Sequence, residues 1–317
     1  MDNYDVILVK ENFQLSIKQL VGSLSWESDI DTLATNLKFD FARNRKDLNF
    51  KIFDILEIGD KVILLNYGVE LFRGIIVNVD WNEFKKSVTC FDYGFYLNTS
   101  KTIKQFYNIQ AYKAISELCS EIEIPIGNIE TMNTNINKIY KNKTISEIIN
   151  DILILVTNET NIKYRIEMEK GKLNIVKYEE IEINDTVVLG EISKSENIQD
   201  MKNSILVSSN EQENTRIIQS TKDEESINKF GVLQDVIMID DFNESQTNNV
   251  AKNKLKELNK IKKEISVTVL GNDKYKAGKI IRLKNDIFDI DGKYLIKNAS
   301  HSYNNSIHKC TLILEVI

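Results

Sequence analysis

The fold of this chain is decided by its C-terminal stretch, which runs from Glu264 to Ile317 and reads EISVTVLGNDKYKAGKIIRLKNDIFDIDGKYLIKNASHSYNNSIHKCTLILEVI. Its first segment, Glu264–Leu270, alternates apolar and polar residues and ends in a Gly-Asn-Asp turn signal. Three more β-rich runs follow, at Lys279–Leu283, Tyr294–Ser302 and Ile307–Val316. We therefore predict a four-stranded antiparallel meander. Because such a unit has open edges, it must close on itself or pair with another strand.

A second copy of this pattern lies at Gly59–Leu97. The matched segments, in the same order and at similar spacing, are Gly59–Leu65 with Gly278–Leu283, Ile76–Asn78 with Ile296–Asn298, and Ser87–Cys90 with Ser306–Cys310. This repetition predicts two versions of one β module in the chain. The alternative is that any two meanders share such generic glycine and asparagine turns.

Length and charge limit the possible classes of protein. A chain of 317 residues is expected to form two or three domains. Its net charge of −6 argues against a protein that coats nucleic acid, whose surface would be basic.

The cysteines predict neither disulfides nor a zinc site. Cys90, Cys119 and Cys310 are odd in number and lack CxxC spacing. Cys90 and Cys310 fall at matched places in the two β copies, where a thiol is expected to act as a small buried apolar group. The N-terminus has no basic signal-peptide region, and no apolar run reaches the roughly 18 residues of a membrane span. We expect a protein made and folded in a reducing cytoplasm.

The period changes from that of strands to that of helices after Lys101. Ala111, Ile115 and Leu118 follow helical spacing, and Thr144 with Glu147 forms a capping box that opens a second helix. The predicted fold class is mainly β with an α+β insert. We expect a first β-barrel module at 1–98, the insert at 99–180, and a second β-barrel module at 181–317. The last has a helix at about 243–261 and a small insert at about 208–242.

The sequence offers no catalytic, metal-binding or cofactor-binding residues. His301 and His308 bracket a hairpin and are expected to be exposed, because no further ligands converge on them. Nucleophile and phosphate-loop motifs are missing. Acidic neighbours occur at Asp29 and Asp31, Asp223–Glu225, and Asp240 and Asp241, and are interpreted as solvated loop residues. We expect no enzymatic activity and no cofactor.

Three stretches carry a resemblance to a known family, namely Trp26–Asp29 with Leu33-Ala34 and Leu37–Phe39, Gly59–Val62 with Leu71–Ile76, and Asp223–Ile227 with Phe230-Gly231. They resemble the baseplate hub proteins of contractile phage tails, the late-control-D group that includes XkdQ/YqbQ-like proteins and the hub of T4-type phages. They contain the candidate subunit-contact positions Trp26, Asp29, Gly59, Asp60, Gly74, Asp223, Ser226 and Gly231. The chain departs from the family pattern at Ser28, where glycine is common, and at Thr35-Asn36, where arginine is frequent. These departures affect the local turn and any contact that this arginine makes.

The resemblance implies two tube-type β barrels per chain and a homotrimer that adapts a six-fold tail tube to a three-fold spike. Three chains with two modules each present six similar surfaces, which would resolve this symmetry mismatch. Expected partners are the tail tube protein, the spike protein and other baseplate proteins, without a membrane. The expected location is the baseplate of a virion or of a phage-tail-like bacteriocin. DNA would pass through the lumen only in a true phage.

Two other functions stay open at this stage. The acidic pairs and the α+β insert are compatible with a tail-associated peptidoglycan hydrolase or a glycan-binding component. A cytosolic adaptor of non-viral origin would be a monomer without a second barrel.

Overall fold

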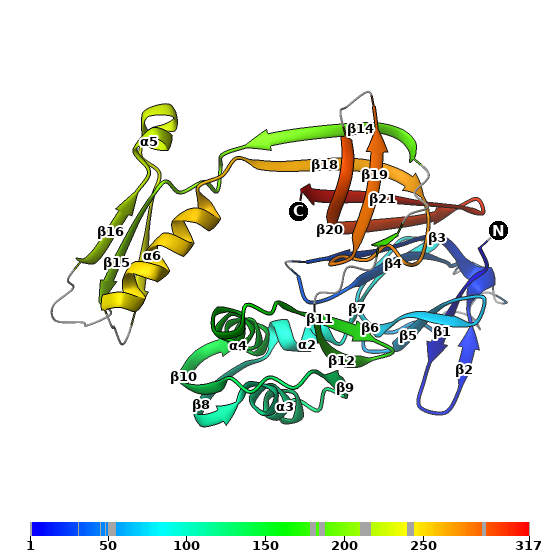
Figure 1. Ribbon diagram of the computed structural model, residues 1–317. Coiled ribbons are helices and arrows are strands. Elements are labelled where there is room, and N and C mark those ends of the chain that lie inside the picture. The colour runs from blue at the N-terminus through cyan, green and yellow to red at the C-terminus, as the bar shows by residue number, and fades with distance from the viewer. Residues whose placement is uncertain are drawn as a thin grey trace. The chain divides into compact units, whose positions relative to one another are not determined.

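The computed structural model of the chain is mainly β, as Figure 1 shows. It describes residues 2–30, 32–44, 46, 47, 49, 55–177, 182, 183, 188–209, 217–239, 244–286 and 290–316. By compactness the chain forms two units, Met1–Ile192 with Ser266–Ile317, and Ser193–Ile265. The boundary predicted at 180 and the acidic residues Asp31, Asp240 and Asp241 lie outside the described residues. No described helix combines the length and apolar character needed to span a bilayer.

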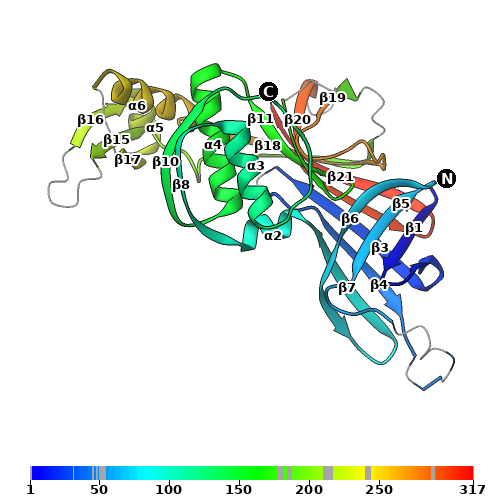
Figure 2. The same ribbon diagram turned by 90° about the horizontal axis from the view of Figure 1, so that it is seen from below.

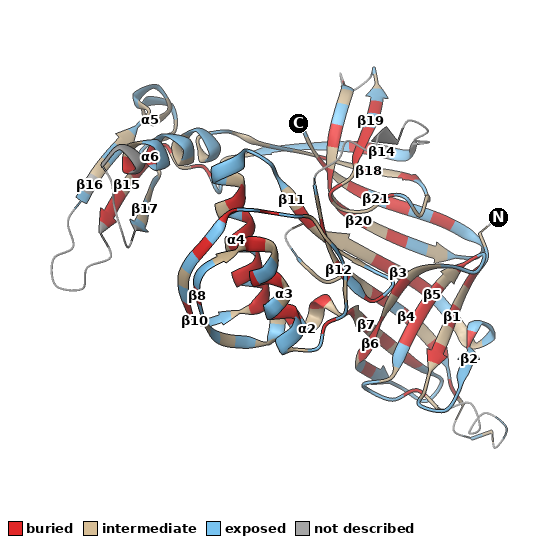
Figure 3. Cartoon of the chain, turned by 60° about the horizontal axis from the view of Figure 1, so that its bottom comes forward, coloured by how far each residue is buried: buried red, intermediate tan, exposed pale blue. Residues whose placement is uncertain are grey.

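The N-terminal part of the first unit is an antiparallel sheet with the strand order β3-β4-β7-β6-β5-β1-β2. Its elements are β1 (Tyr4–Val9), β2 (Gln14–Ser16), the 3-10 helix η1 (Lys18–Leu20), β3 (Val21–Asp29), β4 (Asn36–Ala42), β5 (Lys61–Asn66), β6 (Val69–Trp81) and β7 (Lys85–Asp92). Alternate side chains of these strands point into one core, which includes Leu8, Leu37, Leu64 and Ile76. Figure 3 shows the resulting alternation of buried and exposed residues.

The C-terminal part of the chain, with β13 and β14, forms a second sheet with the order β14-β18-β21-β20, in which β19 pairs with β20 and β13 pairs with β19. Its strands are β13 (Glu182–Ile183), β14 (Val188–Asn197), β18 (Lys262–Leu270), β19 (Ile280–Asn285), β20 (Ile290–Asn304) and β21 (Ile307–Val316). The four predicted strands are confirmed, but their pairing as a simple meander is wrong. Because β18 pairs with β21 and not with β19, only the last three strands form a meander.

β6 contains a β-bulge at Ile76, which is hydrogen-bonded to the turn before β5. The Gly59 N–H donates a hydrogen bond of 2.8 Å to the Ile76 carbonyl, and the Ile76 N–H donates one of 2.9 Å to the Asp60 carbonyl. The register with β7 shifts between Ile76 and Asn78. Gly59 has a φ of +91°, a conformation that side chains other than glycine rarely adopt.

The C-terminal sheet repeats this arrangement. The Gly278 N–H donates to the Ile296 carbonyl at 2.8 Å, and the Ile296 N–H donates to the Lys279 carbonyl at 2.8 Å. The register with β21 shifts between Ile296 and Asn298, and Gly278 has a φ of +82°. The predicted matches of Gly59 with Gly278 and of Ile76–Asn78 with Ile296–Asn298 are confirmed at this level of detail.

The predicted match between Cys90 and Cys310 is wrong. Cys90 lies opposite Ile76, whereas the residue opposite Ile296 is Leu314. The true correspondence is thus offset by four residues, because β20 and β21 run further past the bulge than β6 and β7 do. Both thiols are nevertheless fully buried, as small apolar groups would be.

The insert between the two sheets has its own core. Its elements are α2 (Gly94–Thr99), β8 (Lys101–Gln110), α3 (Ala111–Glu121), β9 (Ile126–Ile129), β10 (Asn135–Thr144), α4 (Ile145–Thr160), β11 (Tyr164–Glu169) and β12 (Lys172–Lys177). The predicted capping box is present, since Thr144 Oγ1 accepts from the Glu147 N–H while the Glu147 side chain accepts from the Thr144 N–H. Figure 2 shows α3 and α4 alongside the β8 and β10 ribbon. The apolar sides of both helices are buried in this core.

The second unit contains a small sheet and two helices. The sheet has the order β16-β15-β17, and its members are β15 (Ser204–Ser209), β16 (Ile217–Lys222) and β17 (Gln234–Ile239). α5 spans Glu224–Phe230, and α6 spans Glu244–Leu258 within the helix predicted at about 243–261. Ile205, Val207 and Ala251 form the buried centre of this unit.

The two larger sheets are one continuous surface of strands, because β20 pairs with β3. This path ends at β14 on one side and at β2 on the other, so the described strands do not close into a barrel.

Replacing Val267 with Asp is expected to unfold the C-terminal sheet, because Val267 is 1% exposed and an unpaired buried charge costs roughly 3 kcal/mol or more. Leu270→Asp on the same strand is the control, because Leu270 is 47% exposed. Denaturant unfolding followed by circular dichroism would check this. A V267D chain as stable as the control contradicts the assignment of this strand face.

Candidate functional site

The pairing between β3 and β20 joins the two sheets and is the first candidate site. Trp26 lies opposite His301, and Asp29 lies opposite Asn298. The Asn298 Nδ2 donates to Glu27 Oε1 at 2.7 Å and to Asp29 Oδ2 at 2.9 Å. Both backbone and side-chain hydrogen bonds therefore hold the first sheet against the second.

Aromatic side chains cover the inner face of this junction. Trp26 stacks on His301, with ring centroids 4.7 Å apart and planes 7° apart. The Tyr4 ring lies 5.0 Å from Trp26 and 4.7 Å from Tyr303, between centroids. These rings bury apolar area and contribute roughly 1 kcal/mol per pair beyond it.

The expectation that the two histidines are exposed is wrong. His301 is 2% exposed and His308 is 4% exposed. The hairpin that they bracket does lie at the end of β20 and β21, but their strand positions point toward Trp26 and Tyr4 rather than toward solvent. Sequence alone could not show this, because the covering strands β1 and β3 come from the other end of the chain.

A chain of hydrogen bonds runs through the two histidines. His301 Nε2 lies 2.8 Å from the Tyr275 carbonyl, and His301 Nδ1 lies 2.9 Å from His308 Nε2. His308 Nδ1 is 2.9 Å from the Tyr4 hydroxyl, which is 2.7 Å from Asp273 Oδ1. Burial lowers the pKa of His301 to about 3. Burial also lowers the pKa of His308, while Asp273 and Asp2 act in the opposite direction.

The edge of β6 is the second candidate site, because it matches the part of β20 that pairs with β3. Since Ile76 corresponds to Ile296, the β6 residues Asn78–Trp81 correspond to Asn298–His301. These β6 residues pair with β7 on one side and with no described strand on the other. Trp81, which takes the place of the buried His301, is 65% exposed.

Gly59, Asp60 and Gly74 have structural roles in the N-terminal sheet. Gly59 makes the turn before β5, and Asp60 forms an ion pair of 2.8 Å with Lys10. A Cβ at Gly74 would lie 2.1 Å from the Phe91 carbonyl oxygen, so only glycine fits there.

Asp223, Ser226 and Gly231 meet in the second unit. Asp223 caps α5 by accepting from the Ser226 N–H at 3.0 Å, and it also accepts from Asn259 Nδ2 at 2.8 Å. The Ser226 hydroxyl donates to Asn259 Oδ1 at 2.7 Å, and the Gly231 carbonyl accepts from Asn203 Nδ2 at 2.7 Å. Sequence reasoning missed Asn203 and Asn259, whose partners are distant in the chain. Asp223 therefore serves as a helix cap.

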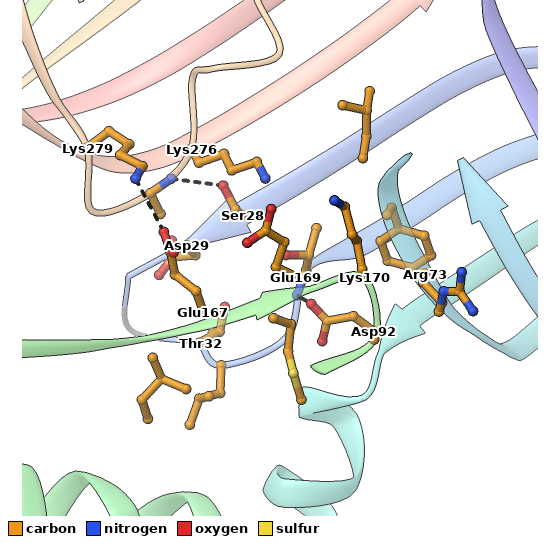
Figure 4. A pocket seen from close by; sticks show the side chains of 18 residues that line it. Ser28, Asp29, Thr32, Arg73, Asp92, Glu167, Glu169, Lys170, Lys276 and Lys279 are labelled. Carbon is orange, nitrogen blue, oxygen red and sulfur yellow. Dashed lines mark hydrogen bonds and ion pairs between the residues drawn. The ribbon is translucent and has the colours of Figure 1, made fainter. Parts of the chain in front are cut away.

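A cavity of about 220 Å³ lies where the insert meets both sheets, and Figure 4 shows its charged lining. Glu167 and Lys279 form an ion pair of 3.5 Å there. The buried Asp92 accepts from the Thr35 N–H and the Gly94 N–H at 2.9 Å each, and burial raises its pKa to about 7. No cluster of three or more His, Cys, Asp or Glu able to hold a metal occurs among the residues that the structure describes.

The candidate positions do not form a single site. Trp26 and Asp29 lie at the junction of the sheets. The N-terminal sheet contains Gly59, Asp60 and Gly74, and the second unit contains Asp223, Ser226 and Gly231. The hydrogen bonds and ion pairs described for these positions all lie within the chain.

Known proteins are similar to the chain over most of its length. The model of the YQBQ-like family matches residues 24–315. The phage-like element PBSX protein XkdQ of Bacillus subtilis is 27% identical over 262 residues, which are 80% of each chain. The 43 kDa tail protein of prophage MuSo2 from Shewanella oneidensis has the same fold with a TM-score of 0.73, at 10% identity and 98% coverage of both chains. A tail protein of Neisseria meningitidis MC58 follows at a TM-score of 0.71 and 13% identity, covering 99% of this chain and 97% of that one.

Acid is expected to destabilise the chain through His301. Its folded pKa of about 3 lies below the ordinary value of 6.5, so the unfolded chain binds more protons between these values and stability falls as the pH falls from 6.5 toward 3. The loss is about 1.4 kcal/mol per pH unit within this window. Unfolding by urea between pH 4 and pH 7 should show a smaller loss for His301→Gln. If the natural chain and the H301Q chain lose equal stability between pH 7 and pH 4, the loss does not come from His301.

Proposed function

The chain belongs to the YQBQ-like family, and from this premise we propose that it is a structural baseplate hub protein of a contractile phage tail or of a phage-tail-like bacteriocin. Its two sheets act as tube-type β modules, at 1–98 and 181–317, with the insert at 99–180 between them. Three chains form a ring that adapts the six-fold tail tube to the three-fold spike.

The observation that carries this proposal is the repeated strand order. The path β3-β4-β7-β6-β5 of the first sheet matches the path β14-β18-β21-β20-β19 of the second. Within the chain, the end of β20 pairs with β3. In the matched paths β6 corresponds to β20 and β14 corresponds to β3. The equivalent pairing would therefore join the end of β6 in one chain to β14 of another chain.

Both strand edges that this second pairing requires are available among the described strands. β14 stands at one end of the path, and Asn78–Trp81 of β6 have β7 on one side alone. An open edge presents unpaired N–H and C=O groups that favour pairing with another chain. Repeating one junction within and between chains yields a closed ring with similar surfaces at every module. Six modules from three chains suit a six-fold tube on one side and a three-fold spike on the other.

The proposed role is not enzymatic. Asp223 accepts a hydrogen bond from the Ser226 N–H, and Asp29 accepts one from the Asn298 side chain. Such hydrogen bonds favour the ionised form of a carboxyl group, which does not suit a general acid. Zymography of the full chain on peptidoglycan separates the hub from a tail-associated hydrolase, and a clearing zone would contradict the proposal. A glycan pull-down tests the alternative of a glycan-binding component, and retention of the chain on the glycan would contradict the proposal.

The proposed partners are the tail tube protein, the spike protein and other baseplate proteins, within a virion or a tail-like particle. In a true phage, DNA would pass through the lumen of the ring. The net charge of −6 supports a lumen that repels phosphate. A strongly positive lumen surface in the assembled ring would contradict this last point.

Trp81→Glu is expected to weaken ring formation at least tenfold, because it places a charge at the proposed pairing edge while the single chain leaves Trp81 exposed. Tyr107→Glu is the matched control, since Tyr107 is an 82% exposed aromatic residue on β8 in the insert. Light scattering of the full chain with tube and spike proteins measures the assembly. A ring that forms equally well from the W81E and Y107E chains contradicts the proposed edge.

A further inference from the structure

The buried hydrogen-bond chain that ends at Asp273 contains one proton too few when its side chains have their ordinary charges. The Tyr275 carbonyl can only accept, so His301 Nε2 carries a proton and His301 Nδ1 is an acceptor in the neutral ring. His308 Nε2 must therefore donate to His301 Nδ1. Neutral His308 then has an acceptor at Nδ1.

The acceptor at His308 Nδ1 competes with Asp273 for one hydrogen. The neighbours of Nδ1 are the Tyr4 hydroxyl at 2.9 Å and Asp2 Oδ2 at 3.3 Å. Because a carboxylate cannot donate, the single Tyr4 hydrogen would have to point toward His308. The Tyr4 oxygen would then face Asp273 Oδ1 at 2.7 Å with lone pairs on both atoms.

The neighbouring amide of Asn66 does not remove this conflict. The Asn66 side chain donates to Asp2 Oδ1 at 3.1 Å and to Asp273 Oδ2 at 2.7 Å, which uses both of its amide hydrogens. The Tyr303 hydroxyl donates to the Asp2 carbonyl at 3.2 Å. Lys276 acts on the far side, where its charge disfavours protonation of His301.

One additional proton removes the conflict at the Tyr4 hydroxyl. Placed on His308 Nδ1, it donates toward the Tyr4 oxygen and Asp2 while Tyr4 donates to Asp273. Placed on Asp273, it donates to Tyr4, and Tyr4 donates to His308. On His308 Nδ1 the proton lies beside two carboxylates, Asp2 and Asp273, which favour a positive charge and oppose the effect of burial.

We propose that Asp2, Tyr4, His308 and Asp273 share one bound proton, taken from solvent on folding, and that this proton forms a latch between the N-terminal segment and the C-terminal sheet. Asp2 and Tyr4 belong to the start of the chain and to β1, whereas Asp273 and His308 belong to the loop after β18 and to β21. Losing the proton places two acceptors against each other at 2.7 Å and loosens the docking of β1. The latch acts within one chain and does not depend on the proposed ring.

Asp273→Asn supplies the missing hydrogen covalently and provides the test. The Asn amide nitrogen can donate to Tyr4, which then donates to His308, while the amide oxygen still accepts from Asn66. A proton held by the folded chain stabilises it at low pH and is lost as the pH rises above the ordinary histidine value of about 6.5. The unfolding equilibrium constant of the natural chain, relative to that of D273N, should therefore rise about tenfold per pH unit between pH 6.5 and the midpoint of the folded chain, and level off above that midpoint.

Asp5→Asn is the matched control on β1, because Asp5 accepts an exposed hydrogen bond from Ser16 and lies outside the cluster. The D5N chain should follow the natural pH profile. Identical profiles for the natural and D273N chains between pH 6 and pH 10 overturn the latch.

Nitrogen NMR of the natural full-length chain gives a second readout that does not depend on a variant's folding. The chain has only two histidines, so their ring signals can be assigned with His301→Gln. Burial lowers the pKa of His308, whereas a proton shared with Tyr4 and Asp273 acts in the opposite direction. The His308 signals should therefore move with a midpoint above the ordinary histidine value of about 6.5. Signals that titrate at or below pH 6.5 overturn the proposal.

Discussion

The backbone pairing of β3 with β20 is the interaction on which the structure depends, because it converts two incomplete sheets into one continuous surface. Neither sheet hides all of its edges by itself. The junction buries the rings of Trp26 and His301 and places the N-terminal strand β1 beside the hairpin of β20 and β21. The corresponding part of β6 pairs with β7 alone among the described strands, and this is the edge that the proposed assembly uses.

The repeat is the feature on which the proposed structural role rests. Gly59 and Gly278 make the same turn with the same hydrogen-bond partners, and each precedes a bulge at an isoleucine, Ile76 or Ile296. The candidate positions at Gly74, Asp60 and Asp223 likewise fix local backbone geometry. Such positions keep strands and turns in a defined place within the chain.

Sequence could predict the features that depend on neighbouring residues. The Thr144 capping box, the alternation in Glu264–Leu270 and the match of Gly59 with Gly278 rest on local sequence, and each is confirmed. Features that depend on distant partners could not be predicted. The burial of His301 requires Trp26, the pairing of β18 with β21 crosses the intervening strands, and the Asn203 contacts join separate loops. Cys90 and Cys310 were mismatched because a similar residue type does not fix register.

The most direct test of the central claim is the symmetry of the assembled ring, measured by electron cryomicroscopy of the full chain with its tube and spike proteins. The account predicts that each sheet is related to the next by about a sixth of a full turn, within and between chains alike. A ring in which the junction between chains involves neither β6 nor β14 would contradict it.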